Sequence, residues 1–169
     1  MQTIARKLVT ALTFLTSAGV TLSAQEMTAA EEKEVAAYRL TTENWTKLQR
    51  AMRAVIDAAK RDPKVRELLN KDDDSEDMDD MSISQMAKKT SEIKPFADAL
   101  RQAGMTPREY AIWTMAYLEA AMVVSLKQSG MTKEIPKDAN LANAKFVEDH
   151  MADLQAIQKE FEQIKKRDP

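Results

Sequence analysis

The sequence predicts an all-α protein: an antiparallel four-helix bundle with one kinked helix, after an N-terminal signal peptide. Three observations favour this class. Apolar residues recur at three- and four-residue spacing in several segments, which is the spacing of helices packed side by side. Only three of the 169 residues are glycine, and alternating strand-like patterns are few. The segment 104–126 is apolar on nearly every side, as expected of a helix surrounded by other helices.

Residues 1–24 have the features of a secretory signal peptide. Arg6 and Lys7 form a basic start, and the uncharged, largely apolar stretch 8–22 follows. Small residues then lead to Ala24, after which we expect a signal peptidase to cleave. The alternative is a retained membrane anchor, for which the apolar stretch is short.

The remaining residues, 25–169, are expected to form a single domain with one packed core. Two of the 25 basic residues and none of the 27 acidic ones lie in the signal peptide, so this domain has a net charge of −4. A mildly acidic domain argues against general nucleic-acid binding. The chain has no cysteine, which excludes disulfides, thiolate metal sites and thiol nucleophiles. We expect an exported protein, periplasmic or secreted, with no transmembrane segment in the mature chain.

The first helix is expected to begin at about Ala29 and to run to the residue before Pro63. Thr28 and Glu31 have the spacing of a capping box, and a proline disfavours helical backbone in the residue before it. A short helical segment, 64–70, is expected next. The apolar stripe of the long helix comprises Tyr38, Thr42, Trp45, Leu48, Met52, Val55 and Ala59.

Residues 71–81 form an acidic loop in this prediction. Seven of the nine residues from 72 to 80 are Asp or Glu, and such a run repels itself and stays solvated. We expect Ser82 or Ser84 to cap the next helix. Pro95 would begin a further helix, which Gly104 would end.

The central helix has several start signals. Thr106 suits the N-cap, Pro107 suits the first helical position, and Glu109 could complete a capping box. The helix should end near Gln128. A last helix, capped by Asp138 or Asn140, is expected to reach about residue 166, with a seam formed by Val147, His150, Leu154, Ile157, Phe161 and Ile164.

The acidic loop is the first candidate site. Its carboxylates Asp72, Asp73, Asp74 and Asp77 could bind calcium weakly. The loop lacks the glycine and the terminal Glu of an EF-hand, so that motif is excluded. The alternatives are a solvated linker or a surface for a basic partner.

Glu119 is the second candidate, because it is the one acidic residue in the middle of the apolar central helix. Burial would raise its pKa and could make it a proton acceptor or a ligand. The alternative is that it pairs with a Lys or Arg across a gap between helices. No Glu-x-x-His motif accompanies it, so a di-iron site is unsupported.

His150, the only histidine, is the third candidate. If the first and last helices run antiparallel, His150 lies near Met52, and a His–Met pair can ligate haem or copper. In topology and compartment the chain resembles the periplasmic b-type cytochrome bundles. Those proteins place the methionine near the start of the first helix and the histidine late in the last, which this chain does not. The alternative is a packed, hydrogen-bonded histidine.

Two stretches carry a second resemblance: AGMTPREYAIWTMAYLEAAM, and YRLTTENWTKLQRAMRAV with the KRDP that follows it. They resemble exported bacterial α-helical proteins that have no assigned function. The resemblance covers a large part of the mature chain and implies a shared fold, export and a bacterial source, but no activity and no site residue.

The motifs leave the function open. We find no nucleophile motif, phosphate loop or HExxH. We therefore expect a non-enzymatic binding or structural protein, whose partner is an unidentified protein or small apolar ligand and whose cofactor, if any, is unknown. The alternative is a periplasmic haem- or copper-binding bundle that uses His150 and Met52.

Overall fold

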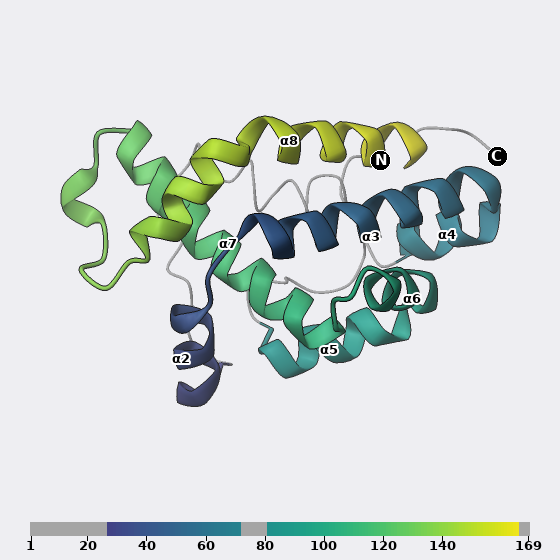
Figure 1. Cartoon of the computed structure of the whole chain (residues 1–169), viewed down its shortest axis with the longest axis horizontal. Coiled ribbons are helices and arrows are strands. Elements are labelled where there is room, and N and C mark those ends of the chain that lie inside the picture. Colours follow the sequence, from purple (N-terminus) through teal and green to yellow (C-terminus); the bar gives the residue numbers. More distant parts are fainter. Residues whose placement is uncertain (1–26, 72–80, 166–169) are drawn as a thin grey trace.

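The structure is a computed structural model that describes residues 27–71 and 81–165 (Figure 1). These residues form seven α-helices and a short 3-10 turn, and they contain no strand, so the all-α class is confirmed. The helices are α2 (Ala29–Ala37), α3 (Thr42–Arg61), α4 (Pro63–Lys71), α5 (Ile83–Glu92), α6 (Lys94–Gln102), α7 (Pro107–Gln128) and α8 (Leu141–Lys165), with the turn η4 (Thr132–Glu134) before α8. None of the described helices is long and apolar enough to cross a membrane. The predicted signal peptide lies outside the described residues.

α7 is the central helix, as the sequence predicts. Its buried residues extend from Tyr110 to Val124 and lie on every side of the helix, and it packs against α2, α5, α6 and α8. The Thr106 hydroxyl accepts a hydrogen bond from the Glu109 backbone N–H at 3.0 Å, and Pro107 is the first helical residue. Gly104 ends the preceding turn with φ +81°, a backbone conformation that residues other than glycine rarely adopt.

The predicted first helix is in fact two helices, α2 and α3, joined by the extended segment 38–41. A second capping box fixes the break: Thr41 N donates to Asn44 Oδ1 at 2.9 Å, and Asn44 N donates to the Thr41 hydroxyl at 3.3 Å. The prediction of one continuous helix was wrong for two reasons. The apolar stripe runs through the break, and Asn44 stands where this motif usually has Glu or Gln.

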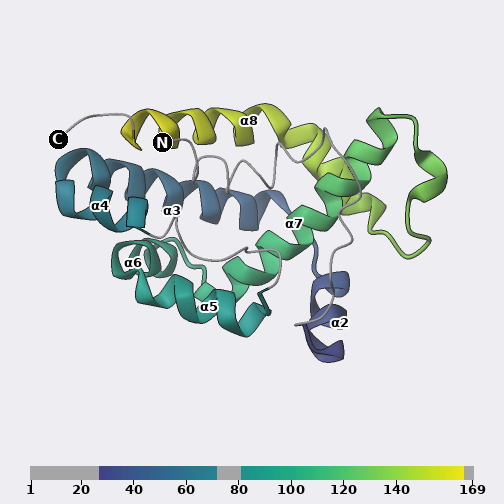
Figure 2. The same cartoon turned by 180° about the vertical axis from the view of Figure 1, so that it is seen from behind.

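α3 and α8 run parallel, so the antiparallel arrangement predicted for the first and last helices is wrong. Near their starts, Leu40 N donates to Asn143 Oδ1 at 3.0 Å. Near their ends, Ile164 packs with Ile56 and Ala59. Both views show the two ribbons pointing the same way, with α7 oblique to them (Figures 1 and 2). The order of helices along the chain did not fix these directions, because four further helices separate α3 from α8.

The other helix ends agree closely with the sequence. Ser82 caps α5 by accepting from Gln85 N at 3.2 Å, and Asn140 caps α8 by accepting from Asn143 N at 3.2 Å. α6 begins one residue earlier than predicted, so Pro95 is its second residue. Of the predicted α8 seam, Val147 and Ile164 are buried and His150, Leu154, Ile157 and Phe161 are half-buried.

Candidate functional site

Five ring side chains form a continuous series across α8, α3 and α7, which we call the aromatic column: Phe146, His150, Trp45, Trp113 and Tyr117. The successive ring centroids are 4.2, 6.3, 5.8 and 5.3 Å apart. The two pairs at the Tyr117 end are stacked, with interplanar angles of 14° and 5°. Such stacked pairs add stability beyond the area they bury. The column contains both tryptophans and the only histidine of the chain.

Asn44 connects the column to the break between α2 and α3. Its Oδ1 accepts from Trp113 Nε1 at 3.2 Å as well as from the backbone of Thr41. Its Nδ2 donates to the carbonyl of Arg39 at 2.8 Å. The extended segment 38–41 is therefore held against the column by one buried amide.

Two donors in the column have no partner. Trp45 Nε1 and the Tyr117 hydroxyl are buried and make no hydrogen bond within the described residues, whereas Trp113 Nε1 does. Burial raises the pKa of the Tyr117 phenol far above its usual value, so this group stays protonated and neutral. Buried polar groups in native proteins nearly always have partners, so two exceptions in one series of rings require an explanation.

His150 lies at the half-exposed end of this column rather than beside Met52. Its ring contacts Phe146 and Trp45, and its Nδ1 is 3.7 Å from Asp153 Oδ2 one turn along α8. Met52 is buried seven residues beyond Trp45, or about 10 Å along α3. The parallel direction of α3 and α8 removes the register on which a His150–Met52 haem or copper site was predicted. That site remains a prediction without geometric support.

Glu119 is half-buried on α7. Burial raises its pKa, and the charge of Asp138 adds to the effect. The pairing with a Lys or Arg that we expected is not formed by any described side chain. Glu119 is therefore a carboxylate that gains a proton more readily than usual.

The predicted calcium ligands Asp72, Asp73, Asp74 and Asp77 lie outside the described residues. Within residues 27–71 and 81–165, no group of three or more His, Asp or Glu side chains is arranged to hold a metal ion.

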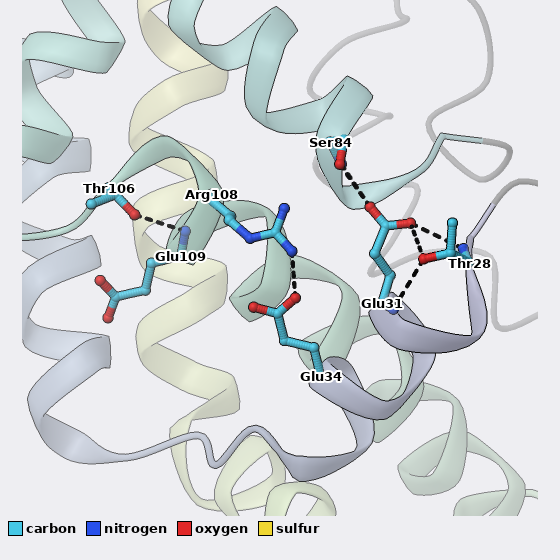
Figure 3. Close-up of polar contacts among 7 residues, drawn as sticks. All are labelled: Thr28, Glu31, Glu34, Ser84, Thr106, Arg108 and Glu109. Carbon is cyan, nitrogen blue, oxygen red and sulfur yellow. Dashed lines mark hydrogen bonds and ion pairs between the residues drawn. The ribbon is translucent and has the colours of Figure 1, made fainter.

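A pocket of about 390 Å³ lies where the starts of α2, α5 and α7 meet; we call it the Glu31 niche. It is lined by Thr28, Ala30, Glu31, Glu34, Ser82, Ser84 and Arg108. Glu31 is only 5% exposed and accepts four hydrogen bonds. Figure 3 shows its carboxylate between Thr28 and Ser84. Two come from the backbone and hydroxyl of Thr28, at 3.0 and 3.1 Å. Two come from the backbone and hydroxyl of Ser84, at 3.1 and 2.9 Å.

These donors determine the charge of Glu31. The Thr28 backbone N–H is the largest influence and lowers the pKa of the carboxyl group; burial raises it, and the Ser84 donors lower it further. The net result is a pKa below the usual value, so Glu31 is ionised at neutral pH. At the mouth of the niche, Glu34 forms an ion pair with Arg108 of α7, which Figure 3 also shows.

Sequence reasoning found part of this niche and missed the rest. The capping box of Thr28 and Glu31 is confirmed. The bonds that Ser84 donates to Glu31 join residues 53 positions apart, and no local pattern predicts them.

Comparisons of the chain with protein-family models, with curated proteins and with solved structures found no match. The aromatic column and the Glu31 niche are therefore interpreted from their own chemistry. The resemblance to exported bacterial helical proteins remains a prediction.

Proposed function

We propose that the protein is an exported, non-enzymatic binding protein that takes a small, planar, largely apolar molecule at the aromatic column. Three buried side-chain groups of the described residues lack a partner: the Tyr38 hydroxyl, Trp45 Nε1 and the Tyr117 hydroxyl. The observation that carries this proposal is that the last two lie in one column of rings. Leaving such a donor unpaired costs on the order of 1–3 kcal/mol. An acceptor atom on a bound molecule would remove that cost.

The side chains of the column indicate the class of ligand. Ring faces and edges favour a flat aromatic or conjugated molecule. An indole N–H only donates, so the ligand should carry a neutral acceptor such as a carbonyl or ether oxygen. Phe146 and His150 are half-buried whereas Trp113 and Tyr117 are buried, so the ligand would approach from the α8 end.

The sequence supports the remainder of the proposal. The basic start and apolar stretch of residues 1–24 support export. The absence of any catalytic motif in the sequence supports binding rather than catalysis. The many methionines of the chain, including the buried Met52 and Met115, give the core side chains that adapt to a bound molecule.

Two probes of closely matched shape test the proposal: 2-acetonaphthone, which has a carbonyl acceptor, and 2-isopropenylnaphthalene, in which a CH₂ group replaces the carbonyl oxygen. Calorimetry and the fluorescence of the two tryptophans should show that the ketone binds about tenfold more tightly, the value of one hydrogen bond. Tyr117→Phe or Trp45→Phe should reduce this preference, because each removes one unpaired donor.

Tyr110→Phe is the matched control, since Tyr110 is a buried tyrosine that packs on Phe96 outside the column. It should leave the preference for the ketone unchanged. If neither probe binds the wild-type chain, or both bind with equal affinity, the proposal is wrong.

A further inference from the structure

α2 is held on the rest of the molecule mainly by polar contacts. Only Glu31 and Val35 of its nine residues are buried, and the helix stands away from the bundle in both views (Figures 1 and 2). Glu31 binds the start of α5 through Ser84, and Glu34 pairs with Arg108 of α7. With Val35 as its one buried apolar side chain, this helix would uncover little apolar surface if it detached.

The segment that joins α2 to α3 is suited to two conformations. Residues 38–41 are extended here, with ψ 140° at Tyr38 and ψ 158° at Thr41. They include no glycine or proline, and the aromatic residues Tyr38 and Trp45, seven positions apart, keep helical spacing across the break. The segment could therefore become helical and join α2 and α3 into one helix from residue 29 to residue 61.

Two sets of bonds oppose this change. The capping box of Thr41 and Asn44 would open, although new backbone bonds within the longer helix would replace it. The bond from Leu40 N to Asn143 would also break, as would the bond from Asn143 Nδ2 to the carbonyl of Tyr38. The bonds from Asn44 Nδ2 to the carbonyl of Arg39 and from Asn140 Nδ2 to the carbonyl of Tyr38 oppose the change as well. Leu40 would leave the buried core, so the two conformations differ in these hydrogen bonds and in the burial of Leu40.

We propose that α2 exchanges between two copies of this chain. The segment 38–41 becomes helical, and the α2 of each copy docks on α5 and α7 of the other through the same Glu31 and Glu34 contacts. The straightened helix carries residues 29–41 about 20 Å beyond the start of α3, far enough to reach a facing copy. Because exchange keeps every α2 contact, the second copy is the partner whose surface already fits this helix.

A charge swap between α2 and α7 tests the exchange. Glu34→Arg and Arg108→Glu are made in separate full-length chains. Each variant then has the same sign of charge at positions 34 and 108, so its α2 meets a like charge both within the chain and on an identical copy. Both side chains are half-exposed, at 39% and 48%, so the fold should tolerate the changes. Mixed together, the two variants recover opposite charges only by exchanging α2.

Sedimentation velocity should show that the mixture dimerises with a dissociation constant at least about tenfold lower than that of either variant alone. One chain that carries both substitutions is the control and should behave as the wild type. The mixture and the wild-type chain are compared at the same concentrations, up to about 1 mM. The proposal is overturned if the mixture stays monomeric wherever the wild-type chain is monomeric.

Thr42→Pro in both chains tests whether dimerisation requires segment 38–41 to become helical. Thr42 is the first residue of α3, where proline is favoured, and Thr41 before it is already extended, with φ −132° and ψ 158°. In one continuous helix the same proline would lose a hydrogen bond and strain the backbone. We expect the mixture of Pro variants to stay monomeric; a dimer as strong as without the proline overturns the proposal.

Discussion

The Glu31 niche and the aromatic column differ in whether their buried polar atoms are hydrogen-bonded. In the niche, one carboxylate at the edge of the bundle accepts four hydrogen bonds from Thr28 and Ser84. In the column, at the centre of the bundle, Trp45 Nε1 and the Tyr117 hydroxyl are left without a partner. The region with little apolar contact is therefore fully hydrogen-bonded, and the region with extensive apolar contact is not.

The difference shows what holds each region in place. α2 buries one apolar side chain, so its position depends on the bonds that Glu31 makes. α7 has buried residues on every side between Tyr110 and Val124, so packing positions the column and tolerates two unpaired donors. Polar atoms are structural in the niche, and in the column two of them lack a partner, which under our proposal a ligand supplies. Substitutions in the two regions should therefore change stability in opposite directions.

The largest effect should come from Glu31→Gln. The amide keeps the size of the carboxylate, but its NH₂ group faces the donors of Thr28 or Ser84, so charge-assisted bonds are lost and a donor is left unpaired. We expect α2 to lose about 2 kcal/mol of its protection from local opening. Hydrogen exchange of the α2 and α5 amides measures this loss directly. Global unfolding should change less, because α2 can detach while the core stays folded.

Glu32→Gln is the matched control, since Glu32 lies in the same turn of α2 and is exposed. It should change amide exchange by no more than about 0.5 kcal/mol. If the α2 amides are equally protected from exchange in Glu31→Gln and Glu32→Gln, the Glu31 carboxylate does not hold α2 in place, and the contrast between the niche and the column is wrong.

The same contrast explains how much of the molecule the sequence predicts. The bond between Thr28 and Glu31 is predictable because three residues separate the partners and the pattern is local. The bond from Glu31 to Ser84 is not, because it depends on how α5 packs beside α2. Likewise, the apolar residues around Trp113 predict burial, but the stacking of Trp113 on Trp45 depends on the placement of two helices.

Helix directions were the main source of error. The sequence predicts the seam of α8 correctly, but it places His150 near Met52 only if α3 and α8 are antiparallel, and they are parallel. The spacing of apolar residues shows which face of a helix is buried, but not which way the helix runs. In the parallel pair His150 lies beside Trp45 instead, within a series of rings.

Acid should reduce the protection of α2 from local opening by a smaller amount than Glu31→Gln does. The pKa of Glu31 is lower in the folded protein than its ordinary value of 4.5, chiefly because of the Thr28 N–H. Its contribution to stability is therefore complete above the unfolded pKa and is lost as the pH falls through the lowered folded pKa. The loss is partial, since a protonated carboxyl group still accepts hydrogen bonds. Amide exchange in α2 measured from about pH 6 to about pH 3 should show the change.

The Glu31→Gln chain provides the reference for this titration. The pKa of Glu43 is also lowered, mainly by Lys47, and contributes in the same pH range in both chains. The excess acid sensitivity of the wild-type chain over the Gln variant therefore belongs to Glu31. Parallel curves for the two chains would show that this carboxylate does not hold α2.

The smallest effect, and the one of opposite sign, should come from Tyr117→Phe. This change removes a buried hydroxyl without a partner and leaves the ring stacked on Trp113. Without ligand, we expect the variant to be more stable than the wild type by up to about 1 kcal/mol, measured by urea unfolding. Tyr110→Phe, in the edge-to-face pair with Phe96, should show no such gain, because Tyr110 is not left without a partner. A loss of stability in Tyr117→Phe would mean that its hydroxyl is already satisfied, and the column would then resemble the niche.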